Sequence, residues 1–243
     1  MELNADVGES WYDDRVGDDA SLLRFLDACN IACGMHGGDA LTMQRTIDLA
    51  LEHGVAIGAH PGYPDRRNFG RRAMELEPAR LEALLSYQIG ALAAMVARSG
   101  GRLHHVKPHG ALYHRANADP TVADLVARVT ADLDVPMLYG PPLGQLRRAA
   151  AARDRLFYAE GFADRRYADD LSLLPRTSVG ACLEEVTEVI EQVAGFGRGE
   201  VRTADGQFRK VEIDTLCIHG DHPGAVERAK AVRRYLDATL PRR

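Results

Sequence analysis

The stretch VAIGAHPG at residues 55–62 joins a short apolar run to a histidine beside a glycine, and the chain contains this pattern four times. The other three stretches are 30–37 (NIACGMHG), 103–110 (LHHVKPHG) and 213–220 (IDTLCIHG). A fifth apolar run, 2–9 (ELNADVGE), ends in carboxylates instead. Strands that each end in a titratable side chain predict a sheet or barrel with one functional edge, where α/β enzymes place their active sites.

Strand-like and helical patterns alternate along the whole chain. We expect strands near 2–7, 29–33, 55–59, 103–106, 136–139, 155–159 and 213–218, and helices near 18–28, 39–53, 78–99, 120–132, 143–152, 180–194 and 224–238. Such alternation implies parallel strands joined by right-handed crossovers. Polar residues on so many strand ends favour a barrel, because only the strands at the switch point line the crevice of an open sheet. We therefore predict an irregular, seven-stranded β/α (TIM-like) barrel that forms a single domain over residues 1–243.

Composition narrows the class of protein. The 243 residues carry a formal net charge of −5, which does not favour binding to nucleic acid or to an anionic membrane. No apolar run reaches the roughly 18 residues of a membrane span, and the first residues do not resemble a signal peptide. The four cysteines form no C-x-x-C pair, so we expect buried free thiols and a cytoplasmic protein.

The first predicted strand carries polar residues on one face. Asn4 and Asp6 are two positions apart, so both side chains point the same way, and Asp6 would reach the pocket floor if that face is the barrel interior. Glu9 follows at the same end. The alternative is that Asn4 and Asp6 only cap the turn at Val7 and Gly8.

His36 and His60 follow the second and third strands, each beside a glycine. Together with Asp6 they could bind a divalent metal ion, because imidazole and carboxylate groups suit zinc and similar ions. The same three groups could equally form hydrogen bonds and transfer protons without a metal. Since no H-E-x-x-H or similar spacing is present, the sequence assigns no metal site firmly.

The segment 106–113 (VKPHGALY) holds the highest density of reactive residue types. A lysine at a buried strand end is unfavourable unless it pairs with an anion or stabilises developing negative charge, and Lys107 is such a residue. His109 is a candidate general acid or base. The alternative is that Lys107 extends to the rim while His109 caps a turn.

The later strands add further candidates. Asp164 and Arg165 suit either the binding of a substrate carboxylate or an ion pair that holds a long loop, and Arg176 is another possible substrate clamp. Asp221 could orient His219 or cap the following helix. No phosphate-binding G-x-x-x-x-G-K-[ST] motif occurs; the glycine-rich 195–199 (GFGRG) follows a helix and lacks the lysine.

Several of these stretches together resemble a known family. In chain order they are LNADVGES at 3–10, NIACGMHGGD at 30–39, VAIGAHPGYPD at 55–65, FGRR at 69–72, YQIGAL at 87–92, LHHVKPHGALY at 103–113, FADRRY at 162–167, LLPR at 173–176 and IHGDHPGA at 218–225. They resemble the LamB/YcsF family of 5-oxoprolinase A subunits from Leu3 to about Tyr235. Met35 and Gly37 depart from the phenylalanine and alanine common in the family, but the polar residues are intact.

The resemblance implies an irregular β/α barrel similar to that of glycoside hydrolases and deacetylases. It also implies ATP-dependent opening of 5-oxoproline to L-glutamate, with partner subunits B and C and a divalent cation, Mg²⁺, accompanying ATP. The matching catalytic candidates are Asp6 or His109 as base, Lys107 as electrostatic stabiliser, and His219 or His60 as proton donor. The matching substrate-binding positions are Asn4, Glu9, His36, His60, Asp164, Arg165 and Asp221.

Because the phosphate-binding motif is missing, we expect partner subunits to supply part or all of the ATP site. Two other functions remain open from the sequence. One is a metal-dependent amidohydrolase or carbohydrate deacetylase, and the other is a non-catalytic subunit that binds a small acid.

Overall fold

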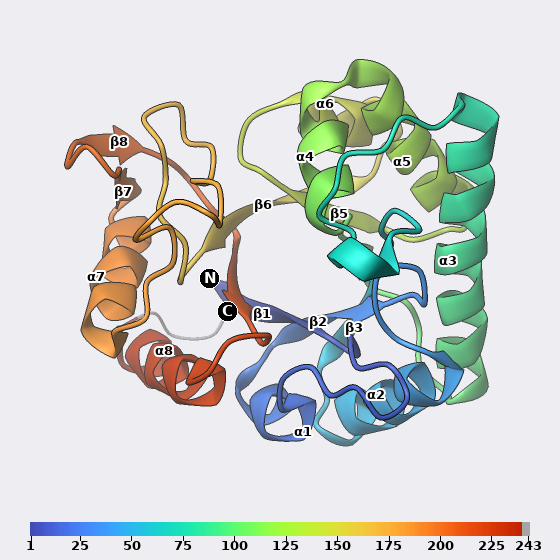
Figure 1. The fold of residues 1–243 in the computed structure, drawn as a ribbon, viewed down its shortest axis with the longest axis horizontal. Coiled ribbons are helices and arrows are strands. Elements are labelled where there is room, and N and C mark those ends of the chain that lie inside the picture. Colours follow the sequence, from blue (N-terminus) through green and yellow to red (C-terminus); the bar gives the residue numbers. More distant parts are fainter. Residues whose placement is uncertain (240–243) are drawn as a thin grey trace.

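The protein, described here by a computed structural model of residues 1–239, is a closed barrel of seven parallel strands surrounded by helices (Figure 1). The barrel closes because β9 pairs with both β1 and β6. This architecture confirms the predicted fold class. In their order around the barrel the strands are β1 (Glu2–Val7), β2 (Ala28–Ala32), β3 (Ala56–His60), β4 (His105–Val106), β5 (Met137–Gly140), β6 (Leu156–Phe162) and β9 (Thr215–His219).

Helices form the outer layer in Figure 1, and a small antiparallel hairpin lies outside the barrel against α7. The helices are α1 (Asp19–Leu22), α2 (Ala40–Glu52), α3 (Pro78–Arg98), α4 (Gly110–Ala118), α5 (Pro120–Asp132), α6 (Gln145–Ala151), α7 (Val186–Gly197) and α8 (Ala225–Thr239), and the hairpin strands are β7 (Glu200–Arg202) and β8 (Phe208–Lys210). Asp119 caps α5 ahead of Pro120, as its position predicts. No helix within residues 1–239 is long and apolar enough to cross a membrane.

Some predicted boundaries were wrong. The helix expected over 18–28 is the single turn α1 followed by a 3₁₀ turn at Leu23–Phe25, because pairing with β1 already begins β2 at Ala28. The helix expected over 180–194 begins only at Val186. The short helix α4 and the β7–β8 hairpin were not predicted at all. The cysteines are free thiols as expected, although Cys182 is only half-buried.

Strand β1 shows how the sequence builds both the core and the site. Leu3, Ala5 and Val7 are at most 1 % exposed and belong to the hydrophobic core, whereas the intervening Asn4 and Asp6 lie among polar groups of the barrel interior. This alternation is the two-residue period of a strand. One face of β1 therefore holds the barrel against its helices, and the other carries functional groups.

A hydrogen-bonded network of polar side chains fills the barrel interior. The Asn4 side chain donates to the Thr215 hydroxyl (2.8 Å), and the Asn30 side-chain amide donates to Asn4 Oδ1 and to Asp6 Oδ1 (2.8 Å each). His105 Nε2 donates to Asn30 Oδ1 (2.7 Å). Because every bond holds the next residue in place, the Asp6 carboxylate has a fixed orientation at the pocket floor.

Gly58 on β3 leaves the space that the His105 ring occupies. A Cβ at this position would lie 2.1 Å from His105 Nε2, so we expect Gly58→Ala to displace the ring from Asn30 and from its stack on Tyr139. The expected loss is about 2–4 kcal/mol of unfolding free energy, measured by urea denaturation. Gly197→Ala is the control, because a Cβ there meets nothing within 4 Å. Equal stability of the two variants would contradict this account.

Asp19 connects α1 to the end of β1. Its carboxylate accepts a hydrogen bond from the Gly8 amide (2.8 Å), and burial raises its pKa to about 6. The unfolded chain, with an Asp pKa near 3.9, releases this proton first as the pH rises. Stability from this group is therefore complete below about pH 4 and is lost as the pH rises to about 6.

We expect Asp19→Asn to remove this loss. Relative to the wild type, the variant should gain about 1–2 kcal/mol between pH 4 and pH 7, after allowance for the side chain's partial exposure. Urea denaturation across this range measures the difference. Asp18→Asn is the matched control. It should change the pH dependence of stability in the opposite direction, because the hydrogen bond to Ser21 lowers the pKa of Asp18. A parallel pH dependence in wild type and Asp19→Asn would show the assignment to be wrong.

Candidate active site

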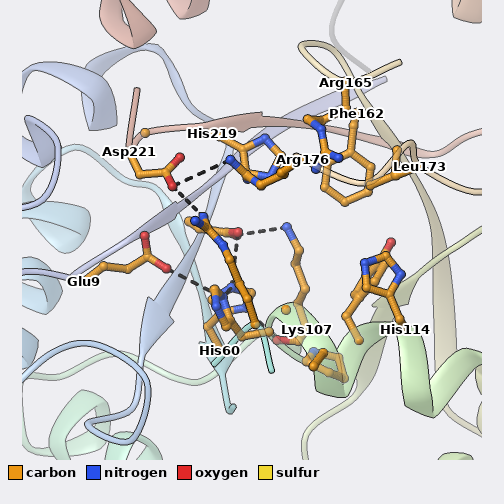
Figure 2. Close-up of a pocket in the computed structure, with 18 of the residues that line it drawn as sticks. Glu9, His60, Lys107, His114, Phe162, Arg165, Leu173, Arg176, His219 and Asp221 are labelled. Carbon is orange, nitrogen blue, oxygen red and sulfur yellow. Dashed lines mark hydrogen bonds and ion pairs between the residues drawn. The ribbon is translucent and has the colours of Figure 1, made fainter. Parts of the chain in front are cut away.

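A pocket of about 220 Å³ opens at the carboxyl ends of the barrel strands, where Glu9, Lys107 and His219 point toward a common space (Figure 2). Its walls come from residues at the ends of β1, β3, β4, β6 and β9 and in the loops after them. It is smaller than the roughly 300–1,000 Å³ pockets that hold drug-sized ligands. The volume therefore suits a small metabolite.

A buried lysine with two carboxylates forms the pocket floor. Lys107 Nζ lies 2.9 Å from Asp6 Oδ1 and 2.8 Å from Glu160 Oε1, and the lysine is 2 % exposed. Burial opposes the charge on Lys107, but Asp6, Cys217 and Glu160 raise its pKa well above the usual value. Burial likewise disfavours the Asp6 anion, but His60 and Lys107 hold the pKa of that carboxyl well below its usual range. The floor thus presents a fixed ammonium group beside an ionised carboxylate.

One wall carries a histidine oriented by an aspartate. The Asp164 carboxylate accepts from His219 Nδ1 (2.8 Å) and from the His219 backbone amide (3.0 Å). The ring also stacks on Phe162, with ring centroids 5.4 Å apart. Because Nδ1 donates to the carboxylate, Nε2 is the nitrogen available for proton transfer, as in aspartate–histidine pairs of hydrolases.

The opposite wall is a cluster of three histidines and one glutamate. The His36 and His109 rings stack with centroids 3.7 Å apart, and His109 Nδ1 lies 2.9 Å from His60 Nε2. Glu9 Oε1 lies 3.5 Å from His36 Nε2 and 3.6 Å from His109 Nδ1. Burial lowers the pKa of His36 and His109 well below the usual value, with nearby histidines adding to the effect, so both rings are neutral. Burial and the carboxylates of Asp6 and Asp221 raise the pKa of Glu9 well above its usual value.

Arginines lie around the rim. Arg71 donates to Asp221 (2.5 Å), and Arg176 lies 3.8 Å from the same carboxylate. Arg165 also lines the pocket, but its guanidinium donates to the backbone carbonyls of Leu174 and Ala181. Arg165 thus holds the loop after β6, while Arg71 and Arg176 are the cations nearer to solvent.

The structure brings the sequence-predicted residues to one end of the barrel, but not all of them line the pocket. Those that do are Asp6, Glu9, His60, Lys107, His109, Arg165, Arg176, His219 and Asp221. Asn4 is fully buried and reaches Asp6 through Asn30. His36 lies behind His109, and Asp164 contacts His219. Asn4, His36 and Asp164 therefore act on the pocket through the residues they contact.

Sequence reasoning missed two charged residues of the pocket region. Glu160 lies within β6 two positions before Phe162. Because residues two apart on a strand share a face, this spacing could have predicted that Glu160 points inward with Phe162. Arg71 lies in an irregular segment after β3, far from Asp221 in the chain. No local sequence pattern could predict that Arg71 and Asp221 lie together.

Fold and site define the class of protein. A parallel β/α barrel with charged and titratable side chains gathered in a small pocket at the carboxyl ends of its strands has the arrangement of an enzyme that acts on a small molecule. The sequence model of the LamB/YcsF family matches residues 1–241, and the chain belongs to this family.

Similar sequences and a similar solved structure support this family membership. The chain is 47% identical over 240 residues to the 5-oxoprolinase A subunit of Symbiobacterium thermophilum, covering 98% of this chain and 92% of the relative. It is 46% identical to the 5-oxoprolinase A subunit of Bordetella pertussis, covering 98% of this chain and 95% of that relative. The crystal structure of a lactam utilization protein from Thermus thermophilus superposes with a TM-score of 0.91 at 38% identity, covering 98% of this chain and 96% of that one.

Proposed function

We propose that this chain is the A subunit of an ATP-dependent 5-oxoprolinase and binds the lactam that the complex opens to L-glutamate. The names of the relatives at 46–47% identity support the reaction, and because those names denote subunits they also support partners, here B and C. The observation in this structure that carries the proposal is the buried Lys107 ammonium at the floor of a small pocket with arginines on its rim. This arrangement is complementary to a compact amide that also carries a carboxylate.

The substrate orientation follows from the charges. We place the lactam oxygen toward Lys107, because that ammonium can stabilise negative charge as it develops on the oxygen. Arg176 is the better candidate for holding the substrate carboxylate, because the Arg165 guanidinium donates to two backbone carbonyls, whereas Arg176 contacts the side chains of His222 and Asp221 at the rim. The exposed fraction of the Arg176 side chain is 22%, so a substrate at the rim can reach it.

The proton transfers involve a base on one side of the pocket, Asp6 or His109, and a proton donor on the other, His219 with Asp164. Transfer of the terminal phosphoryl group of ATP to the lactam oxygen makes the ring carbon electrophilic. Water adds to this carbon and gives a proton to a base, and Asp6 and His109 are our candidates for that base. The carbon–nitrogen bond then breaks while the nitrogen takes a proton, and His219 Nε2, oriented through Asp164, is the donor we favour. Ring opening leaves the phosphoryl group on the new carboxyl group as an acyl phosphate. A second water hydrolyses this acyl phosphate to L-glutamate and phosphate, the ADP having left in the first transfer.

The ATP site remains part of the proposal. The cavity of about 220 Å³ suits the lactam better than a nucleotide. A second cavity shares Tyr113, His114, Phe162 and Leu173 with the first. We place Mg²⁺ with the nucleotide and expect the partner subunits to supply part or all of that site, since the chain has no phosphate-binding motif.

The test is glutamate production from 5-oxoproline and ATP by this chain alone and after reconstitution with subunits B and C. We expect turnover only in the complex, with one ADP released per glutamate. Full activity of the isolated chain would contradict the shared ATP site. No glutamate from the reconstituted complex would overturn the proposed reaction.

A further inference from the structure

The wall made of Glu9, His36, His60 and His109, named here the histidine wall, contains more hydrogen-bond acceptors than donors. Each of the four residues offers one nitrogen or oxygen, all four atoms lie within 4.8 Å of one another, and all four side chains are buried. The proposed lactam chemistry uses only part of this cluster.

The hydrogen bonds of two histidines fix where their protons lie. His60 Nδ1 is 2.7 Å from the Lys107 carbonyl oxygen, and His109 Nε2 is 2.8 Å from the Phe69 carbonyl oxygen. Because a carbonyl oxygen only accepts, each ring donates an N–H to that bond. His60 Nε2 and His109 Nδ1 then face each other at 2.9 Å, and Asp6 Oδ2 lies 3.2 Å from the same His60 nitrogen. Ring nitrogens and a carboxylate oxygen gathered this closely repel each other unless a proton or a metal cation lies between them.

The neighbouring residues add to this excess of acceptors. Glu9 Oε1 and both ring nitrogens of His36 are buried without a hydrogen-bond partner. Buried polar groups without partners are unfavourable, so each such atom points to a missing partner. Here the unpartnered Glu9 oxygen lies 3.6 Å from His109 Nδ1 and faces the same small volume.

We propose that Glu9, His60 and His109 bind one divalent transition-metal ion of the Zn²⁺ type. Atoms bound to the same ion at about 2.0–2.2 Å are roughly 3–3.6 Å apart, which agrees with the 2.9 Å and 3.6 Å separations here. A backbone carbonyl that fixes the other nitrogen of the imidazole is also the usual second contact of a metal-binding histidine.

His36 takes a different part in this site. Its ring is parallel to that of His109, with an interplanar angle of 1°, so the in-plane lone pairs of the two rings cannot converge on one ion. We therefore assign His36 to holding the His109 ring rather than to the metal. Glu9, His60 and His109 line the pocket and His36 does not, so a three-residue site keeps an open coordination position toward the substrate. This set differs from the Asp6, His36 and His60 named from sequence.

Metal binding is tested without substrate or partner subunits, so its outcome is independent of the proposed lactam reaction. The purified full chain is treated with a chelator and titrated with Co²⁺, whose visible absorption bands report binding, and Zn²⁺ is then added as competitor. We expect one equivalent of Co²⁺ per chain, displaced by Zn²⁺. Glu9→Gln and His109→Gln should each weaken binding by roughly 100-fold or more.

His114→Gln is the matched control, because His114 lines the same pocket outside the histidine wall. It should bind Co²⁺ like the wild type. Circular dichroism checks that each variant is folded, and the conservative Glu9→Gln change covers the case in which His109→Gln does not fold. If the wild type binds no metal and nitrogen NMR shows a proton shared by His60 and His109, the proposal is overturned. Unchanged binding by folded Glu9→Gln overturns it as well.

Discussion

Lys107→Met is expected to lower glutamate formation by the reconstituted complex by about 100- to 1,000-fold, because it removes the ammonium group that we propose faces the lactam oxygen. The substitution also leaves Asp6 and Glu160 buried without their shared cation. Removing one partner of a buried ion pair costs about 3–5 kcal/mol, so the single variant is expected to be less stable as well. Initial-rate assays and urea denaturation measure the two effects.

A double variant separates catalysis from stability. Lys107→Met combined with Glu160→Gln removes one of the two unpaired charges, so it should recover part of the stability and none of the activity. Lys210→Met, at an exposed lysine on β8, is the control and should leave both unchanged. Near wild-type glutamate formation by the folded double variant would exclude Lys107 as the stabilising group.

Asp164→Asn is expected to reduce kcat by about 100- to 10,000-fold with a small effect on KM, because the amide cannot hold His219 in the tautomer that leaves Nε2 available for proton transfer. The side chain remains similar in size, so the stability loss should stay near 1–3 kcal/mol. Steady-state kinetics with 5-oxoproline as the varied substrate measure this split.

The pH dependence of kcat distinguishes this positioning role from a purely structural one. A change in the proton-donor step should move the profile, whereas a simple loss of folded protein would scale it uniformly. Asp169→Asn is the control, since Asp169 lies on the same loop and pairs with the surface residue Arg209. An unchanged kcat in Asp164→Asn would exclude His219 as the proton donor.

The barrel and the end at which its polar residues gather could be predicted from sequence. Both follow from short repeats in the chain, namely the alternation of strands with helices and the two-residue alternation of side chains along a strand. Alternation in β1 places Asn4 and Asp6 inward, and parallel strands bring His60, Lys107 and His219 to the same end. Roles within the site could not be predicted in this way. The sequence offered Asp221 as the residue that orients His219, whereas Asp164, 55 positions from His219, makes that contact in the closed barrel.

Charge partners show the same limit. The sequence indicates that a buried Lys107 needs an anion, but it does not say that Asp6 and Glu160 share it. Arg165 was expected either at the substrate carboxylate or in an ion pair that holds a long loop, and its guanidinium contacts loop carbonyls. These pairings join strands and loops far apart in the chain, so no spacing rule reveals them.

The polar network inside the barrel links its two ends. Glu2, at the start of β1, accepts hydrogen bonds from Tyr139 and Thr215, and Thr215 connects through Asn4 and Asn30 to Asp6. Barrel enzymes generally separate a stabilising end from a functional end, so that one can change without the other. Here the two ends share one continuous set of hydrogen bonds. A substitution at Glu2 or Tyr139, which do not line the pocket, therefore alters a hydrogen-bond chain that ends at the Asp6 carboxylate in the pocket.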